Sequence, residues 1–215
     1  DEISVGTGGK QVLYNAFMAT INKGDEVLIP APYWVSYPDI ILLAGGKPKI
    51  VKCEEKDNFK LTPKKLKKAI SKKTKWIILN SPSNPTGSAY TKDEIISLSK
   101  ILLKYKKTYI LSDDIYEHIT YDDFKFFTIA QIDKLKKRTL TMNGVSKSYS
   151  MTGWRIGYAA GPKEIIKAMA KIQSQSTSNP TSISQAAAVE ALNGTQEFIK
   201  ERSDSFKERR DFVVD

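Results

Sequence analysis

The chain has 215 residues, of which 34 are lysine or arginine and 24 are aspartate or glutamate, and its formal net charge is +10. A content of 40% hydrophobic and 27% charged residues is typical of a soluble globular protein and excludes a disordered or fibrous one. The single cysteine, Cys53, excludes an internal disulfide framework, and no apolar run reaches the roughly 18 residues of a membrane helix.

Strand and helix patterns alternate along most of the chain. Short β-rich runs predict strands, and apolar residues at helical spacing predict helices between them. The predicted strands span residues 3–5, 27–30, 48–52, 76–80, 109–113, 139–143 and 156–160. The predicted helices span residues 10–21, 34–43, 63–70, 92–105, 164–173 and 184–192. After Ala160 the pattern is helical to the end of the chain, and its last part is a charged stretch to Asp215.

Two of these helices begin with recognisable caps. Thr62 precedes Pro63 at the first helical position, and Thr91 with Glu94 forms a capping box. We find no repeat and no linker. The alternation therefore predicts one α/β domain, a three-layer α/β/α arrangement whose mostly parallel sheet has about seven strands.

The positive charge is concentrated in lysines of the segment 64–75, where Leu66, Ala69 and Ile70 recur at helical spacing. This pattern favours an amphipathic surface helix with a solvated lysine face. Nucleic-acid binding surfaces usually add arginine and exposed aromatic residues, which this segment lacks. We therefore expect no nucleic-acid partner, although a basic module that binds polyanions remains the alternative from a different functional class.

Ligands of open α/β sheets bind beyond the carboxyl ends of the strands, and several polar motifs fall there. The Gly8-Gly9-Lys10 turn matches neither a Walker loop nor a dinucleotide loop, because Ser4 and Gln11 stand where those templates need other residues. What remains is either a plain turn or a glycine turn whose amides hold an anion at a helix start.

Three further patterns give little support for other chemistries. Ser148 stands where a hydrolase elbow around Ser146 needs its closing glycine. Asp113 and Asp114 are adjacent, so that only one of them faces a given site. The single histidine, His118, has no evident serine or cysteine partner and is interpreted as structural. We predict no metal site.

The segment from Gly144 to Gly157 carries a more specific pattern, with Lys147 three residues after Gly144 and Arg155 eight after Lys147. Three further motifs occur earlier in the chain, and they are Pro32-Tyr33-Trp34, Asn84-Pro85-Thr86-Gly87 and Ser112-Asp113-Asp114-Ile115-Tyr116-Glu117. In their order and spacing, the four motifs together resemble class I aminotransferases of fold type I. The resemblance covers essentially all 215 residues.

The resemblance implies pyridoxal 5′-phosphate as cofactor, bound to Lys147 as a Schiff base. Lys147 would also move the proton between the substrate and the cofactor. Asp113 would pair with the pyridine nitrogen, and Tyr116 and Asn84 would hydrogen-bond the ring oxygen O3′. Without the family, Asp113 is equally a helix cap and Asn84 a turn residue.

The family also implies a phosphate cup formed by Arg155 together with Gly8, Gly9 and Lys10. Trp34 would stack on the cofactor ring. The substrate-binding residues implied are Lys10, Trp34 and Asn84, with Lys10 reaching the distal carboxylate of an acidic substrate.

By this resemblance, the expected reaction moves the amino group of aspartate to 2-oxoglutarate, as in the bacterial aspartate and prephenate branch. Prephenate, aromatic or alanine transamination and a C–S lyase remain alternatives on the same site.

The chain starts with Asp1, and we expect a fragment. Relative to the family, residues 1–215 would be the cofactor-binding large domain, without the N-terminal segment and the C-terminal small domain. We expect a cytoplasmic homodimer for the full-length protein, with amino-acid and 2-oxo-acid substrates and no membrane partner. The isolated fragment is expected to have little or no turnover.

Overall fold

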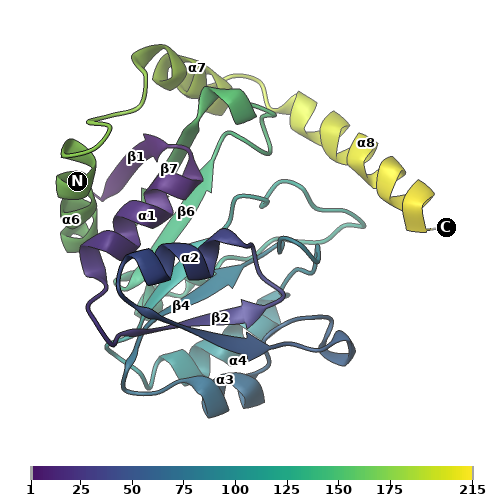
Figure 1. The fold of residues 1–215 in the computed structure, drawn as a ribbon. Coiled ribbons are helices and arrows are strands. Elements are labelled where there is room, and N and C mark those ends of the chain that lie inside the picture. Colours follow the sequence, from purple (N-terminus) through teal and green to yellow (C-terminus); the bar gives the residue numbers. More distant parts are fainter. Residues whose placement is uncertain (1, 215) are drawn as a thin grey trace.

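The computed structural model describes residues 2–214 and contains one seven-stranded sheet (Figure 1). The strands lie in the order β1-β7-β6-β5-β4-β2-β3, and only β7 runs antiparallel to its neighbours β1 and β6. The predicted mostly parallel sheet is thus confirmed. The strands are β1 (Ile3–Thr7), β2 (Glu26–Ala31), β3 (Lys47–Lys52), β4 (Thr74–Asn80), β5 (Tyr109–Asp113), β6 (Thr139–Gly144) and β7 (Ile156–Ala160).

Helices cover both faces of the sheet, as predicted. One face packs against α1 (Gly9–Thr20), α2 (Ser36–Leu43) and α6 (Lys163–Ser174), and the other against α3 (Pro63–Ala69), α4 (Lys92–Leu102) and the short α5 (Asp133–Lys136). Adjacent residues of β4 show the alternation, since Ile78 belongs to the first core cluster and Ile77 to the second. Short 3₁₀ turns occupy Glu55–Asp57, Ile129–Gln131 and Thr152–Trp154.

Two further helices follow the sheet. Helix α7 (Ser182–Asn193) lies over β7, and α8 (Glu197–Val214) extends away from the sheet (Figure 1). Val145, Ile156 and Ala188 form a third buried cluster, against which Phe198 of α8 packs. The charged sequence near the end folds as one long helix, in agreement with the helical pattern predicted after Ala160.

Both predicted caps are present. The Thr62 hydroxyl accepts a hydrogen bond of 3.3 Å from Lys65 N, and Thr91 and Glu94 each accept a bond from the other's backbone amide. Helix α4 ends at Leu102, earlier than predicted. The Arg138 guanidinium donates hydrogen bonds to the carbonyl oxygen of Leu102, at the helix end, and to those of Tyr105 and Thr108 in the segment that follows.

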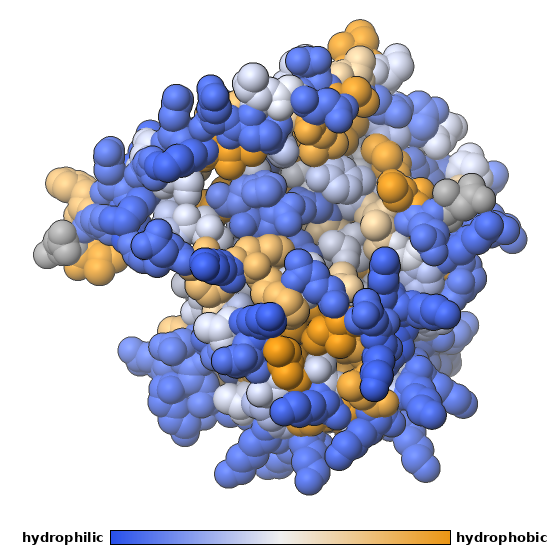
Figure 2. All heavy atoms as spheres, turned by 180° about the vertical axis from the view of Figure 1, so that it is seen from behind, coloured by the Kyte–Doolittle hydropathy of each residue, from blue (hydrophilic) through white to orange (hydrophobic). Residues whose placement is uncertain are grey.

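The lysine-rich helix has the predicted two faces. Leu66 is fully buried, whereas Lys64, Lys67 and Lys68 are exposed. In Figure 2, hydrophilic side chains project from the lower part of the molecule, where Figure 1 places α3. No helix within residues 2–214 is both long enough and apolar enough to cross a membrane.

Candidate active site

A cavity opens at the carboxyl ends of the parallel strands. Strand β5 ends at Asp113, and the Lys147 turn follows the end of β6 at Gly144. Eight of the nine residues singled out from the sequence line this cavity, and they are Gly9, Lys10, Trp34, Asn84, Asp113, Tyr116, Lys147 and Arg155. The ninth, Gly8, contacts the Arg155 guanidinium. Segments far apart in the sequence therefore meet at one place.

Asp113 is buried at the end of β5, with 3% of its surface exposed. The Tyr37 hydroxyl donates a hydrogen bond of 2.6 Å to its Oδ2, and Ile115 N donates one of 3.4 Å to its Oδ1. Burial raises the pKa of Asp113 to about 6, and both hydrogen bonds act in the opposite direction. Asp113 is therefore mostly ionised at neutral pH, as a partner for a cationic ring nitrogen must be.

Tyr116 and Asn84 lie next to each other, as a shared ligand atom would require. Burial raises the pKa of the Tyr116 hydroxyl, the Asp113 charge raises it further, and a hydrogen bond with the Asn84 side chain lowers it. Asn80 holds Asn84 in place, since its Oδ1 accepts a hydrogen bond of 2.8 Å from Asn84 N. Its Nδ2 donates to Asp113 O at 3.0 Å, which ties this loop to β5.

Lys147 is exposed on a turn whose other members are buried. Ser146 and Ser148, on either side of it, are 6% and 5% exposed. Its amine lies 5.8 Å from the centre of the Tyr116 ring. The backbone is therefore fixed while the side chain reaches freely into the cavity, an arrangement suited to a residue that forms and breaks a bond with a ligand.

The Arg155 guanidinium lies against the start of α1. A side chain at Gly8 would place its Cβ 2.2 Å from Arg155 Nη2, and the Gly8 φ of +81° is itself unfavourable for other residues. Arg155 Nη1 also donates a hydrogen bond of 2.8 Å to Thr152 O. A helix N-terminus beside a planar guanidinium forms a binding site for a phosphate group, because both present several N–H donors.

Gly157 makes this close approach possible. A Cβ at Gly157 would lie 2.2 Å from Gly9 N, so that β7 touches the first turn of α1 directly. Gly157 is the last residue of the motif from Gly144 to Gly157, but no role was predicted for it. Only the fold, which brings residues 9 and 157 together, reveals its contact.

Lys10 and Trp34 also line the cavity wall. The Lys10 amine is 5.1 Å from the centre of the Trp34 ring, and the Trp34 and Tyr37 rings meet edge to face with centres 5.4 Å apart. An ammonium group over an indole face is attracted by the negative face of the ring. The cavity thus offers a cation separate from Lys147 and Arg155.

Several lining residues were not predicted. Tyr37 follows Trp34 by three residues, but a tyrosine in an apolar helix is usually a core residue, and nothing local indicated its bond to Asp113. The cavity is also lined by Asn80, Ile115, Met142, Ser146 and Thr152. These residue types are common in cores and turns, so that a search for charged motifs passes over them.

Asp114 and His118, for which no catalytic role was predicted, do not line this cavity. Asp114 is buried with the Ser112 hydroxyl, which donates a hydrogen bond of 2.7 Å to its Oδ1, so the two adjacent aspartates do have separate surroundings. His118 Nε2 lies 3.5 Å from Glu117 Oε1 and its side chain is half exposed.

Comparisons with known proteins agree with the geometry of the cavity. A family model described as aminotransferase class I and II matches residues 1–215. The probable aspartate/prephenate aminotransferase of Rickettsia typhi is 62% identical over 215 residues, which are 100% of this chain and 54% of that protein. The aspartate/prephenate aminotransferase of Cereibacter sphaeroides is 61% identical over 214 residues, or 99% of this chain and 54% of that protein.

Solved structures show the same similarity. The aspartate aminotransferase of Rhizobium meliloti superposes with a TM-score of 0.98 at 57% identity, covering 99% of this chain and 54% of that one. The Thermus thermophilus aspartate aminotransferase with maleate gives 0.95 at 41% identity, covering 99% and 56%. This chain therefore spans about half the length of the relatives that it matches.

Proposed function

The chain belongs to the family of class I and II aminotransferases, and we propose that residues 1–215 are the cofactor-binding large domain of an aspartate transaminase. The observation that carries this proposal is the meeting of Lys147, Asp113 and Arg155 in one cavity. An amine, a buried carboxylate and an anion-binding guanidinium match the aldehyde, the pyridine nitrogen and the phosphate of pyridoxal 5′-phosphate. When bound, the cofactor supplies an electron sink for the bond cleaved at the substrate Cα.

Each side chain then has a defined task. Lys147 Nζ would hold the cofactor and would move the proton between the substrate Cα and the cofactor. The Asp113 carboxylate holds a proton on the ring nitrogen through its opposite charge. Arg155 and the first amides of α1, with Gly8 and Gly9, hold the phosphate.

The remaining groups orient the ring. Tyr116 and Asn84 would bind its phenolic oxygen, and Trp34 would pack against the ring. Asn80 keeps Asn84 in place through the hydrogen bond of 2.8 Å described above. These contacts restrict the reacting atoms to one geometry, which removes much of the entropic barrier.

The substrate that we propose is aspartate, with 2-oxoglutarate as the acceptor of the amino group. Two observations support an acidic substrate: the names of the relatives, and the Lys10 amine at the cavity wall. Prephenate also carries two carboxylates and fits the same cation. Alanine or aromatic transamination and C–S lyase chemistry need no such second cation.

Substrate selection by Lys10 has a direct test in the full-length protein. Lys10→Ala is expected to lower kcat/KM for aspartate by about tenfold or more, because a charge-assisted hydrogen bond is lost. Its kcat/KM for alanine should change by less than about twofold. If the preference for aspartate over alanine stays as in the wild type, Lys10 does not select the substrate.

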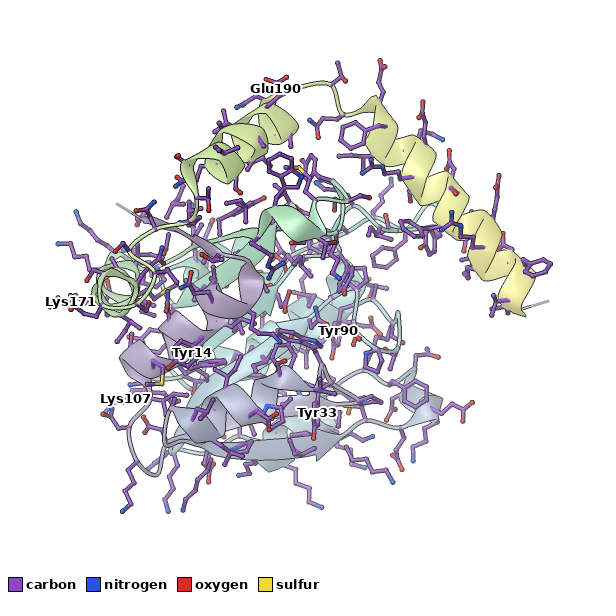
Figure 3. All side chains as sticks on the ribbon, turned by 45° about the horizontal axis from the view of Figure 1, so that its top comes forward. Tyr14, Tyr33, Tyr90, Lys107, Lys171 and Glu190 are labelled. Atoms are coloured by element: carbon purple, nitrogen blue, oxygen red, sulfur yellow. The ribbon has the colours of Figure 1, made fainter. Side chains whose placement is uncertain are left out.

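Attachment to Lys147 is tested by absorption spectroscopy. With pyridoxal phosphate, the wild-type protein is expected to develop a visible band that Lys147→Ala lacks. Lys171→Ala, on the exposed outer side of α6 (Figure 3), is the matched control and should keep the band. Absence of cofactor uptake together with salt-sensitive binding to arbitrary DNA would instead support the polyanion-binding alternative.

We also propose that the full-length protein is a cytoplasmic homodimer. Exposed apolar side chains on α2 and α7 support a second copy as partner, and they include Leu42, Leu43, Ile183 and Val189. Sedimentation of the full-length protein tests this, with twice the chain mass expected and a single-chain mass contradicting it.

A further inference from the structure

Glu117 and Asn143 join the two turns that carry Tyr116 and Lys147. Tyr116 follows β5 and Lys147 follows β6, and these two strands are neighbours in the sheet. The Asn143 side chain donates a hydrogen bond of 2.6 Å from Nδ2 to Glu117 Oε1. Glu117 directly follows Tyr116, so that this bond links the two turns although neither residue lines the cavity.

The other end of the Asn143 amide is fixed as well. Its Oδ1 accepts a hydrogen bond of 2.8 Å from Gly144 N. Gly144 is itself confined, because a Cβ there would lie 2.8 Å from Ile156 O. With both ends of a buried side-chain amide bound, Asn143 holds the point at which the Lys147 turn leaves the sheet.

The Glu117 carboxylate lies beside this part of the molecule. Burial raises the pKa of Tyr158 to about 12, and the negative charge of Glu117 contributes to the rise. Burial also raises the pKa of Tyr149, and the negative charge of Glu117 raises it further. Tyr158 pairs with Asn143 across the sheet, and Tyr149 follows Lys147 by two residues. Glu117 is therefore close to the root of the Lys147 turn.

We propose that Glu117 and Asn143 act as a positioning pair that sets the distance between the Lys147 amine and Tyr116. That distance is 5.8 Å from the amine to the ring centre. Displacement of either turn changes this distance. It also changes the surroundings of Lys147 Nζ, the atom proposed to hold the cofactor and to move the proton. This inference rests on the function proposed above and adds two residues to which no motif of the sequence assigned a role.

The test compares Glu117→Ala and Glu117→Gln in the full-length protein with its cofactor. Glutamine retains an oxygen that accepts from Asn143 Nδ2, whereas alanine does not. Glu190→Ala, an exposed glutamate on α7 (Figure 3), is the matched control. The measurements are kcat and KM for aspartate, the dissociation constant of the cofactor, and the pH midpoint at which its visible band changes.

We expect Glu117→Ala to lower kcat about tenfold with KM within about twofold, since transition-state positioning is lost while substrate contacts remain. Its band midpoint should move by at least about half a pH unit. Glu117→Gln and the control should stay near the wild type. Asn143→Ala should match Glu117→Ala, and the double variant should be no worse than either single variant.

Three results would overturn the positioning role. They are a wild-type kcat and band midpoint in Glu117→Ala, the failure of glutamine to restore them, or additive losses in the double variant. A reduced melting temperature with an unchanged midpoint would likewise show a structural role only. Failure of the proposed function is distinguishable, because then the wild-type protein itself would lack the visible band that depends on Lys147.

Discussion

Tyr37 and Asp113 show how a buried partner adjusts a functional group. The Tyr37 hydroxyl donates a hydrogen bond of 2.6 Å to the Asp113 carboxylate, and both residues are almost completely buried. Burial alone would favour the neutral acid, which has no charge to offer a ring nitrogen. The Tyr37 hydrogen bond favours the ionised form and keeps the pKa of Asp113 at about 6.

Removal of that hydroxyl should therefore weaken cofactor binding. Tyr37→Phe is expected to raise the pKa of Asp113 and to increase the dissociation constant of pyridoxal phosphate about tenfold, as expected for a lost hydrogen bond to a charge. Tyr14→Phe, a half-exposed position on α1 (Figure 3), serves as the control. An unchanged dissociation constant in Tyr37→Phe would show that the hydrogen bond has no part in cofactor binding.

Asp114 should make the stability of the folded protein depend on pH. Burial raises its pKa from 3.8 to about 7, although hydrogen bonds from Thr128 and Ser112 act against this. Because the folded pKa lies above the unfolded one, the folded protein binds more protons between these values. The contribution of Asp114 to the stability of the folded protein is therefore complete below about pH 4 and is lost as the pH rises to about 7.

Asp114→Asn carries no titrating group, so its stability relative to the wild type should increase with pH. We expect a relative gain on the order of 2 kcal/mol between pH 5 and pH 8 in urea unfolding of the cofactor-free protein. A difference between the two proteins that does not vary with pH would contradict this interpretation of Asp114.

At the scale of elements, local patterns predicted where strands and helices form better than where they end. The caps at Thr62 and Thr91 are local, and both helix starts were found. The Leu102 carbonyl at the end of α4 accepts a hydrogen bond from Arg138, which lies more than 30 residues away and binds two further carbonyl oxygens of the segment after the helix. No local pattern contains such a contact, since it exists only once the sheet has formed.

The same distinction holds for the site. Lys147, Arg155 and Asp113 were identified because charged residues stood at family-like spacings. Tyr37, Asn80 and Asn143 act through contacts with distant segments and are ordinary residue types, so their roles required the fold. Gly157 belongs partly to both groups of residues. The motif that contains it was recognised from the sequence, whereas its contact with α1 required the fold.

The junction of β7 with α1 yields a prediction of its own. Gly157→Ala places a methyl group against the Gly9 backbone and should displace the start of α1 from Arg155. We expect cofactor affinity to fall at least about tenfold, because the phosphate would lose several donors together. Gly153→Ala, where a Cβ meets nothing within 4 Å, is the matched control. Equal affinity in the two variants would argue against this phosphate site.

The whole molecule places the cavity-lining groups together at the carboxyl ends of the parallel strands of a single sheet. Helix α8 extends from this body and is attached to it by the Arg210 ion pair with Asp122 and by the Ser203 hydroxyl, which donates to Thr120 O at 2.9 Å. Most of the +10 charge lies on exposed lysines, and only Lys10, Lys147 and Arg155 among the basic residues line the cavity.

The central claim is that Lys147 holds the cofactor. Its most direct test is reduction of the full-length protein and pyridoxal phosphate with borohydride, followed by peptide mapping in a mass spectrometer. The structure predicts one stable pyridoxyl adduct, on Lys147, that is absent from Lys147→Ala and retained in Lys171→Ala. An adduct spread over exposed lysines, or none at all, would contradict the claim.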